Sequence, residues 1–192
     1  MLAATFFGVI LACFAGEITC NEMKAMGKSI QGCNDDEFHD PGYSPGCMFP
    51  CTSGTGETSV QMKEYKNATV CVDFEEDEDK KLHHVGICLG GKCKGHRERC
   101  PECTESDLEK RWSSLPELAG EFHRCPTLDQ NTPVENCLYI CTTIHDEVEK
   151  EGYFYGIYKD GNPCTLTDSK EGECRSGWCY AKEVLNPHSI RD

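Results

Sequence analysis

The sequence of 192 residues is short of hydrophobic side chains and of basic ones. Hydrophobic residues make up 38% of it, below the roughly 45–50% that is usual for soluble domains. That fraction includes 16 cysteines, so we do not expect a single large hydrophobic core. Lysine and arginine number 19 against 33 acidic residues, which gives a net charge of −14. Such a chain repels phosphate backbones, which disfavours a nucleic-acid-binding role and favours basic protein partners.

Motifs that mark common catalytic sites are missing as well. The sequence holds no Gly-x-Ser-x-Gly, no His-Glu-x-x-His and no phosphate-binding glycine loop, so we predict that it is not an enzyme and needs no cofactor. On paper, His83, His84 and His96 could join the cysteines around them in a zinc site. However, the nearby spacing Cys88-x4-Cys93 recurs as Cys174-x4-Cys179 with no histidines beside it. That repetition favours structural disulfides, and we predict no metal site.

Long apolar runs are confined to the N-terminus. Residues 1–16, MLAATFFGVILACFAG, are uncharged and apolar and end in small residues. This pattern predicts a secretory signal cleaved after Ala15 or Gly16, with a buried strand or helix as the alternative. No later stretch approaches the roughly 18 apolar residues of a membrane span. We therefore expect a secreted, extracellular protein in an oxidising compartment, where thiols pair.

The spacing of the cysteines shows an internal duplication. The first set runs Cys33-x13-Cys47-x3-Cys51-x19-Cys71-x16-Cys88-x4-Cys93, and the second runs Cys125-x11-Cys137-x3-Cys141-x22-Cys164-x9-Cys174-x4-Cys179. The x3 and x4 intervals are identical, and Gly91 and Gly177 occupy matching positions. We predict two homologous modules, each with three disulfides. Six cysteines allow 15 connectivities, and the spacing does not choose among them.

The predicted fold is small, disulfide-rich and mainly β or irregular. Two tandem cysteine-stapled modules, residues 17–103 and 125–192, are joined by a short helical linker over residues 104–124. Glycine-containing turns at residues 89–92 and 175–178 predict tight hairpins, and the aromatic stretch 153–158 predicts a strand.

The linker carries its own helix signals. Thr104, with Asp107 three residues later, predicts a helix N-terminus, and Pro116 is expected to break the helix into short turns. Leu108, Trp112 and Leu115 recur at helical spacing, which favours packing against the second module over a binding role.

Signal cleavage would leave 15 cysteines, three of them outside both sets: Cys20, Cys100 and Cys103. We expect Cys20 to pair with Cys100 or Cys103 and so to close the first module end to end. The remaining thiol would be available for a disulfide-linked dimer. The spacing of Cys100 and Cys103 is also that of thiol redox sites, but no strand–helix unit surrounds it, which favours structural pairing.

Two groups of residues are candidate contacts for a protein partner. One is an acidic run, for which a solvated loop is the alternative; its spacing is not that of an EF-hand. The other is an aromatic cluster, which is either a small core or a set of interface anchors. The candidate residues are Asp73, Glu75, Glu76, Asp77, Glu78, Asp79, Tyr153, Phe154, Tyr155 and Tyr158. Asn67 begins an Asn-Ala-Thr sequon and is a predicted glycosylation site.

The cysteine motifs resemble a known family. The segment Tyr158-Lys-Asp-Gly-Asn-Pro-Cys164, followed by Glu171-Gly-Glu-Cys174-Arg-Ser-Gly-Trp-Cys179-Tyr180, is similar to the C-terminal half of the basic-tail salivary proteins of hard ticks. Asn136-Cys137-Leu-Tyr-Ile-Cys141 resembles the Cys-x3-Cys that opens those domains, and Gly86-Ile-Cys88-Leu-Gly-Gly-Lys-Cys93 carries the same pattern more loosely. The resemblance covers about residues 33–100 and 125–180 and does not extend to a Lys-rich tail.

The resemblance implies a salivary protein that binds a host protein and blunts clotting or innate immunity, with a coagulation protease or a complement component as the partner. The chemokine-binding evasins of ticks share the Cys-x3-Cys and Cys-x4-Cys elements, so an anti-inflammatory chemokine binder is the second hypothesis. Evasins have a shorter interval before the fourth cysteine and one further cysteine. A secreted structural or redox protein that uses Cys100 and Cys103 is the third hypothesis.

Overall fold

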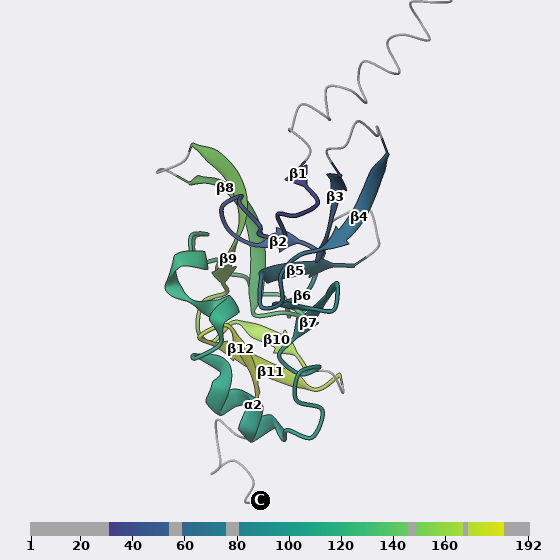
Figure 1. The fold of residues 1–192 in the computed structure, drawn as a ribbon. Coiled ribbons are helices and arrows are strands. Elements are labelled where there is room, and N and C mark those ends of the chain that lie inside the picture. Colours follow the sequence, from purple (N-terminus) through teal and green to yellow (C-terminus); the bar gives the residue numbers. More distant parts are fainter. Residues whose placement is uncertain (1–30, 54–58, 76–80, 146–148, 167–168, 183–192) are drawn as a thin grey trace, which may run out of the picture. The chain divides into compact units, whose positions relative to one another are not determined.

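The structure is a computed structural model that describes residues 31–53, 59–75, 81–145, 149–166 and 169–182. These residues form short strands and one α-helix, arranged in space as Figure 1 shows. They also carry seven disulfides, which confirms a small, mostly β, disulfide-rich fold. They divide into two compact units. The first comprises the described residues of Met1–Asp35 and Pro50–Met62, and the second those of Asp36–Phe49 and Lys63–Asp192. The predicted signal segment and Cys20 lie outside the described residues.

The first unit contains a parallel pairing of residues 31–32 with residues 51–52. β1 (Gln31–Gly32) pairs with β3 (Met48–Thr52), and Gln31 lies opposite Cys51. The Cys33–Cys51 disulfide cross-links the chain at the end of this pair. β4 (Val60–Glu64) completes a sheet in the order β1-β3-β4, and all five of its residues are exposed.

The second unit begins with a four-stranded sheet. Its strands are β2 (Ser44–Pro45), β5 (Val70–Phe74), β6 (Leu82–Leu89) and β7 (Lys92–Gly95), in the order β2-β5-β6-β7. Gly90 and Gly91 form the turn between β6 and β7 with φ of 57° and 70°, a left-handed conformation that glycine adopts without steric cost. This is the hairpin predicted at residues 89–92, and it sets Cys88 opposite Cys93.

The C-terminal part of the second unit repeats this hairpin. β8 (Leu138–His145) and β9 (Lys150–Ile157) pair along their whole length, as the aromatic stretch predicted. β10 (Pro163–Thr165), β11 (Glu171–Arg175) and β12 (Trp178–Ala181) form an antiparallel sheet. The β11–β12 turn sets Cys174 opposite Cys179, the register found between Cys88 and Cys93.

The helix predicted in the linker is present and begins at the predicted N-cap residue, Thr104. α2 (Glu105–Trp112) starts at Thr104, whose side chain accepts a hydrogen bond from the Asp107 amide while Asp107 accepts one from the Thr104 amide. Two 3₁₀ turns, η1 (Pro116–Leu118) and η2 (Gly120–Phe122), follow it, because Pro116 cannot continue a helix. The Trp112 indole N–H donates to the Ser176 carbonyl oxygen at 3.0 Å, so α2 lies beside the β11–β12 turn (Figure 1).

Within the described residues, buried side chains form three small clusters. One consists of aliphatic and aromatic side chains: Tyr43, Val72, Val85, Leu138 and Tyr155. The other two are built mainly from cystines, around Cys47, Cys71 and Cys88 and around Cys137, Cys164 and Cys174. Cystine sulfur therefore occupies interior volume that aliphatic residues would fill in a larger core, which fits the low hydrophobic content.

Seven disulfides connect the described cysteines, and both six-cysteine sets are paired in the same order. The first cysteine pairs with the third, the second with the fifth, and the fourth with the sixth. The bridges are Cys33–Cys51, Cys47–Cys88 and Cys71–Cys93 in the first set, and Cys125–Cys141, Cys137–Cys174 and Cys164–Cys179 in the second.

The seventh bridge joins Cys100 to Cys103, so the expectation that one of these pairs with Cys20 is wrong. The two cysteines lie on one tight turn, in which the Cys103 amide donates to the Cys100 carbonyl oxygen at 3.0 Å. Their Cα atoms are 5.3 Å apart, within the range that a disulfide spans without backbone movement.

Candidate functional site

Two of the four aromatic residues predicted to bind a partner, Phe154 and Tyr155, lie inside the molecule. Phe154 is 1% exposed and Tyr155 7% exposed; because neighbours on a strand point to opposite faces, β9 is covered on both sides here. The Tyr155 hydroxyl donates to the Leu118 carbonyl oxygen at 3.0 Å, and its ring stacks on His123 at a centroid distance of 4.7 Å. These two residues therefore belong to the core, which is the alternative raised above.

Tyr153 and Tyr158 are half-buried and keep part of their surface exposed. The Tyr153 ring contacts Phe74 at a centroid distance of 5.5 Å. The Tyr158 ring contacts Tyr139 at 5.7 Å. Partner binding by Tyr153 and Tyr158 stays a prediction.

The described residues of the acidic run form ion pairs with basic side chains of the same chain. Asp73 and Glu75 are described, whereas Glu76, Asp77, Glu78 and Asp79 lie outside the described residues. Lys81 forms ion pairs with Glu75 at 3.2 Å and with Glu135 at 2.5 Å. Phe74, between the two described acidic residues, contacts Tyr153. The structure thus brings one end of the acidic run next to one residue of the aromatic group.

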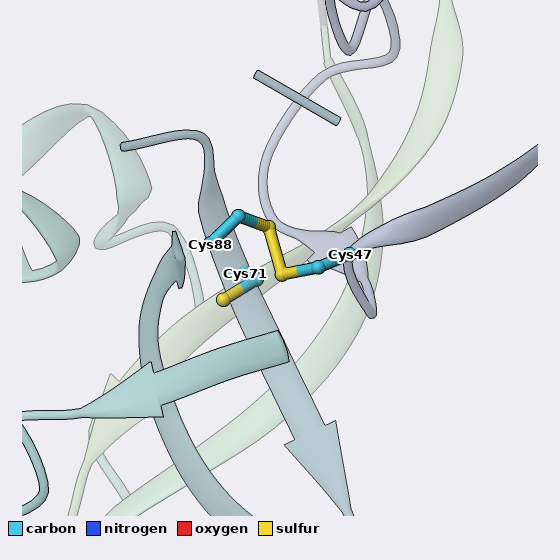
Figure 2. Close-up of side chains that lie close together, drawn as sticks. All are labelled: Cys47, Cys71 and Cys88. Carbon is cyan, nitrogen blue, oxygen red and sulfur yellow. A yellow bond between two sulfur atoms is a disulfide. The ribbon is translucent and has the colours of Figure 1, made fainter. Parts of the chain in front are cut away.

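Two groups of three cysteines lie close enough to hold a metal ion, around Cys47 and around Cys137. Figure 2 shows the Cys47–Cys88 disulfide with Cys71 beside it. Cys71 is itself bonded to Cys93, and the second group is paired in the same way. Because metal binding requires thiolates, neither group is a metal site in the oxidised protein. A third group, Asp73, His83 and His84, contains no cysteine.

A groove that the sequence did not reveal lies among β6, β7, α2 and the β11–β12 hairpin. It encloses about 430 Å³. The two tryptophans of the chain, Trp112 and Trp178, meet edge to face within it at a centroid distance of 4.7 Å. The Arg97 guanidinium lies 5.1 Å from the centre of the Trp178 ring, a cation–π distance. We refer to this feature as the tryptophan groove.

Carboxylates surround the tryptophan groove: Glu75, Glu98, Glu117 and Glu135. Lys94 donates to Glu98 at 2.8 Å and thereby lowers the pKa of that carboxyl group. Glu117 is 1% exposed and contacts the Arg99 guanidinium, but burial outweighs this contact and raises the pKa of Glu117.

The signals that could have indicated the groove were weak. Trp112 was one of the residues at helical spacing in the linker, and Trp178 lay in the predicted hairpin turn at residues 175–178, for which only a structural role was predicted. Their proximity depends on α2 packing against the β11–β12 turn, a contact between residues 64 positions apart.

Asn67, the predicted glycosylation site, is exposed. Its side-chain oxygen accepts a hydrogen bond from the Gly90 amide at 3.2 Å. The Thr69 hydroxyl of the same sequon donates to the Lys66 carbonyl oxygen at 2.7 Å. The sequon therefore lies on a turn that is ordered by its own side chains and open to solvent.

The fold and these surfaces define a small, mostly β, disulfide-rich protein of the kind found in oxidising, extracellular environments. Among the described residues, no helix is long and apolar enough to cross a membrane. No protein-family model, curated protein or solved structure matches the chain.

Proposed function

We propose that the chain consists of two tandem homologous modules, residues 17–103 and 125–192, joined by a helical linker over residues 104–124. The support is the pairing order, which is the same in the two six-cysteine sets. In both sets the last two cysteines also flank a hairpin turn with the same register. A shared order at matching positions is what duplication of one module produces.

The mature protein is, in our proposal, secreted and non-enzymatic, and neutralises a host protein of haemostasis or innate immunity by covering its functional site. A coagulation protease or a complement component is the proposed partner. The observation that carries this proposal is the repeated three-disulfide arrangement, because cross-linked loops have little conformational entropy left to lose on binding. The resemblance of the cysteine motifs to basic-tail salivary proteins supplies the class of partner.

The tryptophan groove is the contact surface that we propose. Tryptophan and arginine are the residues most enriched among the strong contributors to protein interfaces. Arg97 already lies over the buried Trp178 ring, whereas Trp112 is only half-buried in the groove. An arginine or lysine of a partner would therefore meet the Trp112 ring, with carboxylates along the same groove. A net charge of −14 would accelerate the encounter with a basic partner in a salt-dependent way.

The test is capture from vertebrate plasma, and from a mixture of chemokines, by the mature, oxidised, glycosylated protein at two salt concentrations, with the bound proteins identified by mass spectrometry. Capture of one coagulation protease or complement component, followed by inhibition of its activity, is the expected result. Salt-sensitive capture of chemokines alone would instead favour the evasin-like hypothesis. Failure to retain any plasma protein or chemokine at low salt would contradict a binding function.

A matched pair of variants locates the contact. Glu135 borders the groove and pairs with Lys81, whereas Glu171 is outside it and pairs with Lys182. Both side chains are exposed, at 69% and 77%, and Glu135→Lys and Glu171→Lys change the net charge equally. We expect Glu135→Lys to slow association with the captured partner several-fold more than Glu171→Lys does. Equal effects would show that only overall charge matters and that the groove is not the contact surface.

A further inference from the structure

A β-bulge places two consecutive histidines against one aspartate. Along the β5–β6 pair, Asp73 lies opposite His84 and Phe74 lies opposite Leu82, so the register shifts between these positions. His83 is the extra residue on β6. In a regular strand, neighbouring side chains point to opposite faces, whereas a bulge re-aims a side chain and is over-represented next to functional sites. Both imidazoles consequently reach the same carboxylate.

The three side chains converge through one atom each. His83 Nδ1 lies 2.9 Å from Asp73 Oδ2 and 3.1 Å from His84 Nδ1, and the third separation, from His84 Nδ1 to Asp73 Oδ2, is 3.8 Å. In a tetrahedral zinc site with bonds of about 2.05 Å, neighbouring ligand atoms are about 3.3 Å apart. The observed separations lie on both sides of this value.

The hydrogen bond on the far side of the His84 ring orients it for metal binding. His84 Nε2 lies 3.2 Å from the Cys93 carbonyl oxygen and 3.5 Å from Glu98 Oε2. Both of these oxygens accept hydrogen bonds, so Nε2 carries the proton and Nδ1 presents its lone pair to Asp73 and His83. Metal-binding histidines characteristically donate their second N–H to a carbonyl or a carboxylate in this way.

Two neighbouring residues keep the bulge and the His84 ring in this arrangement. The Asn136 side-chain Nδ2 donates to the backbone carbonyl oxygens of Leu82 and His83 at 3.2 and 3.3 Å, which satisfies acceptors on the bulged strand. Gly95 lies beneath the His84 ring, where a Cβ would come within 2.9 Å of His84 Cδ2. The ring can therefore occupy this position only because residue 95 has no side chain.

We propose that Asp73, His83 and His84 bind a divalent transition-metal ion of the zinc type. Two imidazoles and a carboxylate are a ligand set that suits Zn²⁺, Cu²⁺ and Ni²⁺ better than Ca²⁺ or Mg²⁺, which take mainly oxygen ligands. Three protein ligands leave the fourth tetrahedral position to water or to a donor atom of another molecule. The site does not involve cysteine, so it is compatible with the oxidised protein.

Proton positions are consistent with this proposal. In the metal-free protein, the proton on His83 Nδ1 is donated to Asp73 Oδ2. Binding requires the tautomer with the proton on Nε2 instead, which frees the Nδ1 lone pair. The His83 side chain is 60% exposed, so this exchange of tautomers proceeds through water.

The test is titration of the tag-free, oxidised protein with Zn²⁺ by calorimetry and with Co²⁺ by visible absorption. We expect one ion per chain and the intense visible bands of tetrahedral Co²⁺. Imidazole NMR signals of the wild-type protein should shift for His83 and His84 on Zn²⁺ addition. Absence of Zn²⁺ binding, or shifts confined to other histidines, would overturn the proposal without any substitution being needed.

Variants then identify the ligands. Asp73→Asn, His83→Ala and His84→Ala should each lower the Zn²⁺ affinity by more than the roughly 10–100-fold that loss of an outer hydrogen-bond partner causes. The control is His39→Ala, which removes an exposed histidine outside the triad and should leave the affinity unchanged. Circular dichroism confirms that each variant is folded. An equal loss in His39→Ala, or unchanged affinity in all three triad variants, would contradict the assignment.

Discussion

Removal of the Cys47–Cys88 bridge tests how much of the stability depends on cross-links between distant segments. This bridge joins residues separated by 41 positions, and its counterpart Cys137–Cys174 joins residues separated by 37. For loops of this length, the loss of unfolded-chain entropy corresponds to about 4 kcal/mol at 25 °C. Cys100–Cys103 spans three positions, for which the same relation gives about 2 kcal/mol.

The double variants Cys47→Ala/Cys88→Ala and Cys137→Ala/Cys174→Ala should therefore lose similar amounts of unfolding free energy, each about 2 kcal/mol more than Cys100→Ala/Cys103→Ala. Guanidinium unfolding followed by tryptophan fluorescence measures these losses, because both tryptophans lie in one groove. The reasoning is refuted if the short-loop variant loses as much as the other two. It is also refuted if the two long-loop variants differ by more than about 2 kcal/mol, half of the expected loss.

Three further predictions concern single sites. Asn67 should carry an N-linked glycan, so digestion with an N-glycosidase should lower the mass and convert Asn67 to aspartate, and Asn67→Gln should show no such change. Burial lowers the pKa of His96, so the folded chain binds a proton at this residue less tightly than the unfolded chain does. The free energy of unfolding should therefore fall as the pH drops below about 6.5, and His96→Gln should reduce that pH dependence. Cys100 and Cys103 are both half-buried, whereas each of the other bridges contains at least one buried cysteine, so mild reduction followed by alkylation should label Cys100 and Cys103 first. Earlier labelling of Cys47 or Cys174 would contradict the structure.

Local features of the fold followed from the sequence because their causes are local. The hairpin at residues 89–92 requires positive φ, which two adjacent glycines supply. The start of α2 required only Thr104 and Asp107, which satisfy each other's backbone amides. The proposed repeat was predicted from the cysteine spacing, because the same bridges close only at similar spacings.

Features that depend on contacts between distant segments did not follow. The aromatic stretch 153–158 has the composition of a surface anchor, and only the packing of residues far away in the sequence makes Phe154 and Tyr155 interior. The bulge at His83 is a shift in pairing between β5 and β6, which no residue type in the two strands marks. The histidines were therefore grouped with cysteines close in sequence, and the carboxylate of Asp73 was assigned to the acidic run.

The pairing order of the cysteines is the central claim of this account, because both the proposed duplication and the proposed binding function rest on it. Proteolysis of the secreted protein without reduction, followed by mass spectrometry of the cross-linked peptides, measures it directly. We expect the order first–third, second–fifth and fourth–sixth in each six-cysteine set, together with Cys100–Cys103. A bridge between the two sets, or a different order in one of them, would contradict the account.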